Sequence, residues 1–134
     1  MIAVTENEGA VVLDMQGDFS EPAMDEFSRV ISGLIDSRKV QIVLSVRRVG
    51  WVSLKSIKWL AGNLKKLRQR NGDIRLTGLS PYWTSLLELT ENQNLFGIYA
   101  SVEEAVASYR MASSGASREA AAISGSRLLT TAAG

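Results

Sequence analysis

Three carboxylates near the amino end come closest to a catalytic arrangement in this chain. Asp14 and Asp18, with Glu21 nearby, are residue types that carry acid–base chemistry or hold magnesium. Charges that flank the end of a strand are usually solvated surface. The chain has no histidine and no cysteine, so it lacks the commonest general base and metal ligand and any thiol nucleophile. We therefore expect no enzyme activity, no catalytic residue, no metal site and no cofactor.

A basic segment offers a second kind of chemistry, the binding of a partner. Arg47 and Arg48 are placed in the loop that follows an apolar strand, and Ser53 is a good cap for the helix that comes next. Ser56 is a first-turn residue of that helix. The helix is crowded with cations: Lys55, Lys58, Lys65, Lys66, Arg68 and Arg70. A solvated basic face explains them as well as a binding surface does, because exposed lysines commonly serve solubility.

Two tryptophans favour the binding interpretation. On a 3.6-residue period Trp59 falls off the apolar stripe of the helix and next to Lys55 and Lys58, so we expect it to be at least partly exposed. An exposed tryptophan beside lysine is typical of an interface anchor. Trp51, in the preceding loop, either joins this surface or folds inward over the end of the sheet. The candidate partner-binding residues are Arg47, Arg48, Trp51, Ser53, Lys55, Ser56, Lys58 and Trp59.

Composition limits the rest. A chain of 134 residues, 46% apolar and 22% charged, is ordinary for one globular domain, and a net charge of +1 is too small to favour nucleic acid or an anionic membrane. No apolar run approaches the roughly 18 residues of a membrane span, and Met1 to Gly9 lacks the features of a signal peptide. We expect a cytoplasmic protein with no membrane insertion and no nucleic-acid partner.

Alternating apolar patterns predict an α/β fold in which these residues are positioned by a mixed sheet of four or five strands and about four helices. The apolar run at 40–46 is expected to be a central strand. The helix after Ser53 should bury the stripe Leu54, Ile57, Leu60, Ala61, Leu64 and Leu67. In chain order we expect a hairpin at 2–5 and 10–15, a helix at 21–37 and a strand at 40–46. A second helix, capped by Ser53 and stopped at Asn71 and Gly72, is followed by a strand at 74–77 and a helix opened by Ser80 and Pro81. The last elements are a strand at 95–99 and a helix at 102–109 capped by Ser101 with Glu104.

The chain divides into a domain at 1–110 and a tail at 111–134. The tail is rich in alanine, serine and glycine and has few large apolar groups to bury, so we expect it to be flexible.

Three motifs at matching spacing carry a family resemblance. Gly72 to Pro81 is similar to a Gly-Gly-x-Leu-x-Leu-x-Gly-Leu-Ser-Pro segment, and it is followed by Leu-Glu-Leu-Thr at 87–90 and Leu-Phe-x-Ile-Tyr at 95–99. Together with the order of the elements, these motifs resemble the STAS domain of bacterial anti-sigma-factor antagonists over about residues 9 to 109. The resemblance implies a STAS-like sheet with helices packed against it.

The resemblance also implies a lost switch. In that family, the loop before the second helix carries an Asp-Ser-Ser-Gly signature whose second serine is phosphorylated by a partner kinase. Here Ser53 falls at the aspartate, Leu54 at the first serine, Lys55 at the phosphoacceptor and Ser56 at the glycine. A lysine cannot be phosphorylated by a serine kinase. Ser53 and Ser56 remain as neighbouring hydroxyls, although a cap and a first-turn residue explain them better.

What the resemblance implies for function is partner switching in signal transduction and transcription regulation. The chain is interpreted as a non-catalytic STAS-type module whose partner is a protein, such as an anti-sigma factor or a regulatory kinase. Two alternatives stay open. One is a soluble STAS subunit of a membrane transport assembly. The other is a nucleotide- or small-ligand-binding STAS domain in which Arg47, Arg48 and Lys55 receive phosphates.

Overall fold

A computed structural model of the chain describes residues 1–92 and 94–113. The elements in chain order are β1 (Ile2–Asn7), β2 (Ala10–Gly17), α1 (Glu21–Asp36), β3 (Gln41–Val49), α2 (Leu54–Arg68), β4 (Asp73–Thr77), α3 (Pro81–Leu89), β5 (Gly97–Tyr99) and α4 (Val102–Ser113). Each predicted strand and helix is present, and the α/β class is confirmed.

The strands form one mixed sheet whose spatial order is the chain order, β1-β2-β3-β4-β5. β1 pairs antiparallel with β2, and the other neighbours are parallel. β3 is therefore the central strand, as its apolar sequence predicts. Parallel strands end at a common edge of the sheet, so the connections that follow β2 and β3 meet there.

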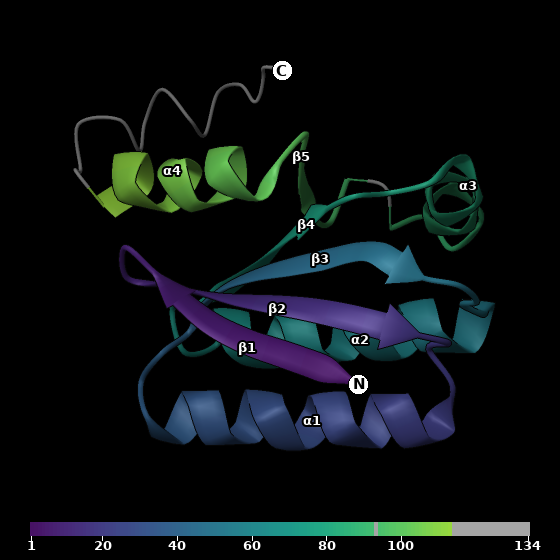
Figure 1. Cartoon of the computed structure of the whole chain (residues 1–134), viewed down its shortest axis with the longest axis horizontal. Coiled ribbons are helices and arrows are strands. Elements are labelled where there is room, and N and C mark those ends of the chain that lie inside the picture. The colour runs from purple at the N-terminus through teal and green to yellow at the C-terminus, as the bar shows by residue number, and fades with distance from the viewer. Residues whose placement is uncertain (93, 114–134) are drawn as a thin grey trace.

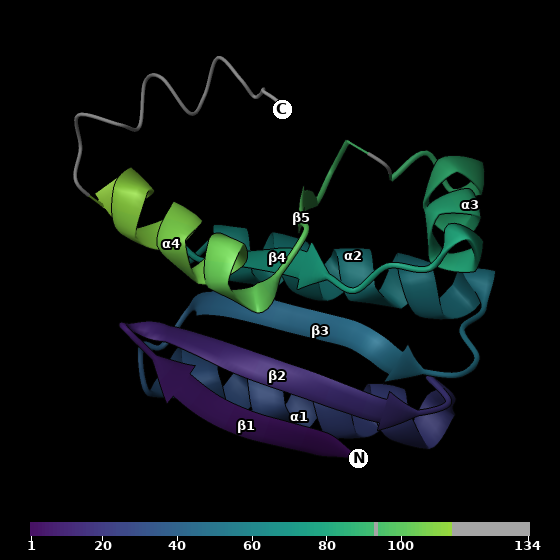
Figure 2. The ribbon, with the colours of Figure 1, turned by 45° about the horizontal axis from the view of Figure 1, so that its top comes forward.

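Helices cover both faces of the sheet. α1 and α2 lie side by side against one face, and α4 lies against the other (Figures 1 and 2). α3 stands at the end of the sheet where α2 begins (Figure 1). No helix among the described residues is both long enough and apolar enough to cross a membrane.

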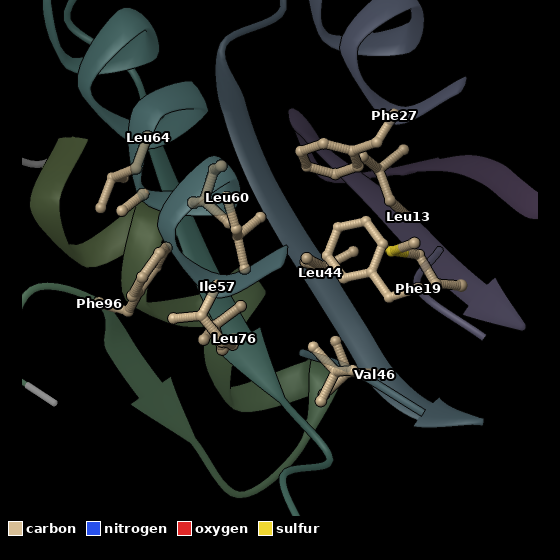
Figure 3. Close-up of a cluster of buried hydrophobic side chains, with 14 of the residues drawn as sticks. Leu13, Phe19, Phe27, Leu44, Val46, Ile57, Leu60, Leu64, Leu76 and Phe96 are labelled. Carbon is tan, nitrogen blue, oxygen red and sulfur yellow. The ribbon is translucent and has the colours of Figure 1, made fainter. Parts of the chain in front are cut away.

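The main core lies between the sheet and the α1–α2 layer. Figure 3 shows Leu13 and Leu44 of the sheet facing Phe27 of α1 and Leu60 of α2, and all four are fully buried. Burial of each such side chain contributes about 1.5–3 kcal/mol. A smaller cluster forms beneath α4, from Ala10, Val12, Val43, Ala105, Val106 and Tyr109.

Helix caps fix where the helices begin. The Ser56 amide donates to the Ser53 hydroxyl, the Trp83 amide to that of Ser80, and the Glu104 amide to that of Ser101. The predicted starts of α2, α3 and α4 are thus confirmed. A Cβ at position 72 would overlap the carbonyl oxygen of Val40, which explains the glycine that follows α2.

Some predicted boundaries are wrong. β3 continues to Val49 rather than ending at residue 46, so Arg47 and Arg48 belong to the strand and not to the loop. β5 begins at Gly97, two residues later than expected, and α4 continues to Ser113. The rest of the predicted tail, residues 114–134, lies outside the described residues.

Candidate functional site

Two connections meet at the carboxyl edge of the sheet, where the sequence places most of the candidate residues. The Gly50 amide donates to the Gly17 carbonyl over 3.1 Å, and the Phe19 amide donates to the Trp51 carbonyl over 2.7 Å. These bonds hold the β2–α1 connection against the β3–α2 connection. The site is therefore built on backbone that is fixed from two sides.

Ser53 and Ser56 complete this junction. The Ser56 hydroxyl donates to the Phe19 carbonyl over 2.7 Å, and the two serine hydroxyls lie 3.0 Å apart. Ser56 is only 1% exposed. The prediction that Ser53 caps α2 is confirmed, and Ser56 fastens the first turn of α2 to the neighbouring connection. Both hydroxyls serve the local structure.

Lys55 forms an ion pair with the first residue of α1. Its Nζ lies 2.6 Å from Oε2 of Glu21, and both side chains are largely exposed. The hydrogen bond and charge of Lys55 lower the pKa of Glu21, and Glu21 in turn raises the pKa of Lys55. Both groups are therefore charged at neutral pH. Lys55 therefore already has a carboxylate partner within the domain.

Three large side chains are exposed beside this pair, and we call Trp51, Leu54 and Tyr82 the apolar patch. They are 48%, 45% and 48% exposed. The Tyr82 hydroxyl donates to the Val52 carbonyl over 2.6 Å, which brings the start of α3 against the segment that carries the other two. Trp51 thus lies outward rather than over the sheet.

The predicted burial of Leu54 is wrong. It was expected in the buried stripe of α2, but it is exposed, whereas Ile57 and Leu60 are fully buried. Leu54 is the first residue of α2, one turn before the helix reaches the core. Helical spacing alone does not show where the sheet ends. Tyr82 was missed altogether, and its one sequence signal is an aromatic residue directly after the helix-opening Pro81.

Trp59 is half-buried, so the expectation of partial exposure is confirmed. Its ring also packs against two core aromatics, with centroid distances of 6.2 Å to Phe19 and 5.8 Å to Phe27. Such aromatic contacts stabilise the packing of α2 against α1. Trp59 is therefore partly a structural residue, packed against the core and only in part exposed.

The two arginines lie apart from the α2 lysines. Val46 and Val49 belong to the main core, and Arg47 and Arg48 between them are exposed. Arg48 pairs with Gln16, whose neighbour Met15 belongs to the main core, so Arg48 lies on the sheet face opposite α1 and α2. Arg47 is the extra residue at a register shift between β2 and β3. The structure thus divides the predicted basic group. Lys55 and Lys58 lie in the first turns of α2, next to Leu54 of the apolar patch, whereas Arg47 and Arg48 belong to β3, and Arg48 lies on the sheet face away from α2.

The three carboxylates do not form a common site. Glu21 is paired with Lys55, Asp18 is exposed in the connection, and Asp14 lies in β2 with one buried carboxylate oxygen that has no hydrogen-bond partner. Within residues 1–92 and 94–113, no group of three or more acidic residues could hold a metal ion.

The chain matches known proteins over the region just described. A family model described as "STAS domain" matches residues 1–105. BtrV of Bordetella bronchiseptica, which is named an anti-sigma factor antagonist, is 22% identical over 105 residues, covering 78% of this chain and 90% of BtrV.

Solved structures share the fold. The anti-sigma factor antagonist SpoIIAA of Bacillus, in its unphosphorylated form, superposes with a TM-score of 0.71 at 15% identity and covers 82% of this chain and 96% of SpoIIAA. A sulfate transporter family protein from Wolinella succinogenes gives a TM-score of 0.68 at 17% identity, with 80% and 89% of the two chains covered.

Proposed function

Because the chain belongs to the STAS domain family, we propose that it is a non-catalytic protein-interaction module of the anti-sigma-factor-antagonist type, which binds its partner without a phosphoacceptor serine. The observation that carries this proposal is the apolar patch. Trp51, Leu54 and Tyr82 are about half exposed at the edge of the sheet where α2 begins. The likeness to BtrV and SpoIIAA supports the choice of partner class, an anti-sigma factor or a regulatory kinase.

The apolar patch has the composition of an interface centre. Tryptophan and tyrosine are enriched among the residues that dominate binding energy, and they work best when they are held in place and ringed by polar groups. The hydrogen bond from Tyr82 to Val52 fixes one member, and that from Phe19 to the Trp51 carbonyl fixes the backbone of another. Lys55 and Lys58 supply the charged rim.

The lysine at position 55 separates this module from a phosphorylation switch. A phosphate in a packed interface adds charge repulsion and a desolvation cost, and so releases a partner. Lys55 offers no hydroxyl and presents a permanent positive charge that is paired with Glu21. Ser56 is buried, and the hydroxyls of Ser53 and Ser56 are both engaged, which supports their structural role. The output would then depend on the abundance or state of the partner.

A second candidate is a STAS subunit of a transport assembly, and the likeness to the Wolinella succinogenes protein favours keeping it. It would use the same apolar patch, with a transport protein as partner. The nucleotide-binding alternative has weaker support, because Lys55 is already paired with Glu21 and Arg48 lies on the sheet face away from α2.

Affinity capture from an extract of the source organism tests the proposal. Wild type is compared with Trp51→Ala/Leu54→Ser, which leaves the core intact, and with Leu89→Ser, which removes an exposed leucine at the far end of α3. A partner retained by wild type and by Leu89→Ser but lost by the double variant supports the proposal. An anti-sigma factor then indicates the first candidate, and a permease indicates the second. Equal retention by all three proteins contradicts the proposal.

A further inference from the structure

The outward face of α2 carries a row of four lysines, three of which have no ion-pair partner among the described residues. Lys55, Lys58, Lys65 and Lys66 are exposed, and the helix sequence from Leu54 to Arg68 contains no acidic residue. Lys55 pairs with Glu21. Lys58, Lys65 and Lys66 form no ion pair with any residue in the described part of the chain. The positive charge of this face is therefore available to a partner.

The fold itself does not need this charge. α2 is held by its opposite side, where Ile57, Leu60 and Leu64 are fully buried. Lys55 lies in the first turn of α2, where the helix dipole disfavours positive charge, whereas Lys65 and Lys66 lie in the last turn, where the dipole favours it. Lysines three residues apart on one face also repel one another. The dipole therefore accounts for the lysines at the end of α2 but not for Lys55 and Lys58 at its start.

Gly62 lies in the centre of the lysine face. It follows Lys58 by four residues and precedes Lys66 by four, so the three positions line up along the helix. Glycine is among the least favourable residues in a helix interior, yet a Cβ at Gly62 would meet no atom within 4 Å. No packing within the described chain requires this glycine. Its effect is to leave the helix backbone open to close approach between flanking cations.

We propose that this lysine face docks an acidic helix of a partner protein, which crosses α2 at Gly62 and places its carboxylates against Lys58, Lys65 and Lys66. A small residue at a crossing point lets two helices approach closely. The lysines could reach the phosphates of a membrane or of nucleic acid without a glycine between them. The lysines and Gly62 together therefore favour a protein helix as the occupant. The inference rests on the proposed function, because it describes the chemistry of the partner that the apolar patch anchors.

The test uses a synthetic peptide as the probe. A lactam-bridged helical peptide with glutamates at a spacing of four residues is titrated into the labelled full-length protein at low ionic strength, and binding is followed by fluorescence anisotropy. The probe control is a peptide of the same length and net charge in which two internal residues are replaced by proline, so that it cannot form the helix. We expect the helical peptide to bind at least about ten-fold more tightly than the control, given that an unfolded peptide must also be ordered on binding.

Gly62→Gln is the decisive variant. A glutamine is a better helix former and meets no clash, so the thermal stability of the protein should rise while peptide affinity falls by about ten-fold, because the added side chain blocks the crossing. Lys65→Glu/Lys66→Glu should also abolish peptide binding. Arg48→Glu makes the same charge change per residue on the opposite sheet face and should leave peptide binding unchanged. Unchanged affinity in Gly62→Gln overturns the inference. So does equal binding of the two peptides, or preferential binding of duplex DNA or phosphatidylglycerol vesicles.

The failure of this inference can be told from the failure of the proposed function. Trp51→Ala/Leu54→Ser should bind the helical peptide as wild type does, since the peptide lacks the apolar anchor. If Gly62→Gln loses the peptide, the docking of an acidic helix is supported. If Trp51→Ala/Leu54→Ser nevertheless retains the partner, the role of the apolar patch in partner binding is contradicted.

Discussion

Lys55 and Glu21 tie the first turn of α2 to the first turn of α1, with 2.6 Å between Nζ and Oε2. The family resemblance places a phosphorylated serine at the position of Lys55. Lys55 presents there a permanent positive charge that is paired with the Glu21 carboxylate. The pair lies beside Leu54 of the apolar patch, so its charge belongs to the rim of the proposed interface.

Reversing that charge should weaken partner binding. In Lys55→Glu a second carboxylate faces Glu21, and its repulsion and desolvation act on the interface as a phosphate would, so we expect affinity for the captured partner to fall at least about ten-fold. Isothermal titration calorimetry measures the change. Lys55→Gln, which removes the charge without reversing it, should lose much less affinity. If Lys55→Glu binds as tightly as wild type, Lys55 lies outside the interface.

The Lys55–Glu21 pair should show in a pH titration. The lowered pKa of Glu21 means that its contribution to stability is present above the unfolded-state pKa and is lost as the pH falls through the folded-state pKa. The raised pKa of Lys55 means that its contribution is present below the unfolded-state pKa and is lost as the pH rises through the folded-state value. NMR of the Glu21 carboxyl carbon should give a low titration midpoint that moves upward in Lys55→Gln. The same midpoint in both proteins would show that the pair does not persist in solution.

Ser56→Ala should destabilise the junction between the two connections. The variant leaves the buried Phe19 carbonyl without its donor, which costs about 1–3 kcal/mol of unfolding free energy. Urea denaturation measures the loss. Ser85→Ala is the matched control, because Ser85 is exposed in the middle of α3 and should change stability by less than about 0.5 kcal/mol. Equal stability of the two variants would contradict the structural role of Ser56.

Tyr109 should make the fold sensitive to alkaline pH. Its hydroxyl donates to the Ile42 carbonyl and accepts from the Ile42 amide, and burial raises its pKa. A raised folded-state pKa gives stability that is present below the unfolded-state value of about 10 and is lost as the pH rises above it.

In Tyr109→Phe, neutral-pH stability should fall by about 1–3 kcal/mol, because the Ile42 groups lose their partner. The further loss above about pH 10 should be smaller than in wild type. Urea denaturation at neutral and alkaline pH measures both effects, and Tyr82→Phe, which changes a half-exposed tyrosine, should keep the alkaline sensitivity of wild type. A Tyr109→Phe curve parallel to that of wild type would place the alkaline sensitivity elsewhere.

The sequence predicts the scaffold well and the site only in part. Local rules located the Ser53 and Ser101 caps and the central strand, because capping and strand burial depend on neighbouring residues. They failed for Arg47 and Arg48, since a register shift between β2 and β3 extends the strand beyond its apolar run. They also failed for Leu54, because periodicity does not reveal the end of the sheet.

Contacts distant in sequence account for the rest. The Lys55–Glu21 pair spans 34 residues, and the Tyr82–Val52 hydrogen bond spans 30. The aromatic contacts of Trp59 likewise depend on where α1 lies. No local pattern encodes these pairings, so the sequence does not show that Tyr82 joins the segment that carries Trp51 and Leu54.

Chemical-shift mapping of the captured partner on the ¹⁵N-labelled protein tests the central claim most directly. We expect the largest amide perturbations at residues 50–58 and 81–84, which carry the apolar patch and its rim, with little change across β1. Perturbations confined to β1, α4 or the residues beyond it, with residues 50–58 and 81–84 unchanged, would contradict a binding site at the start of α2.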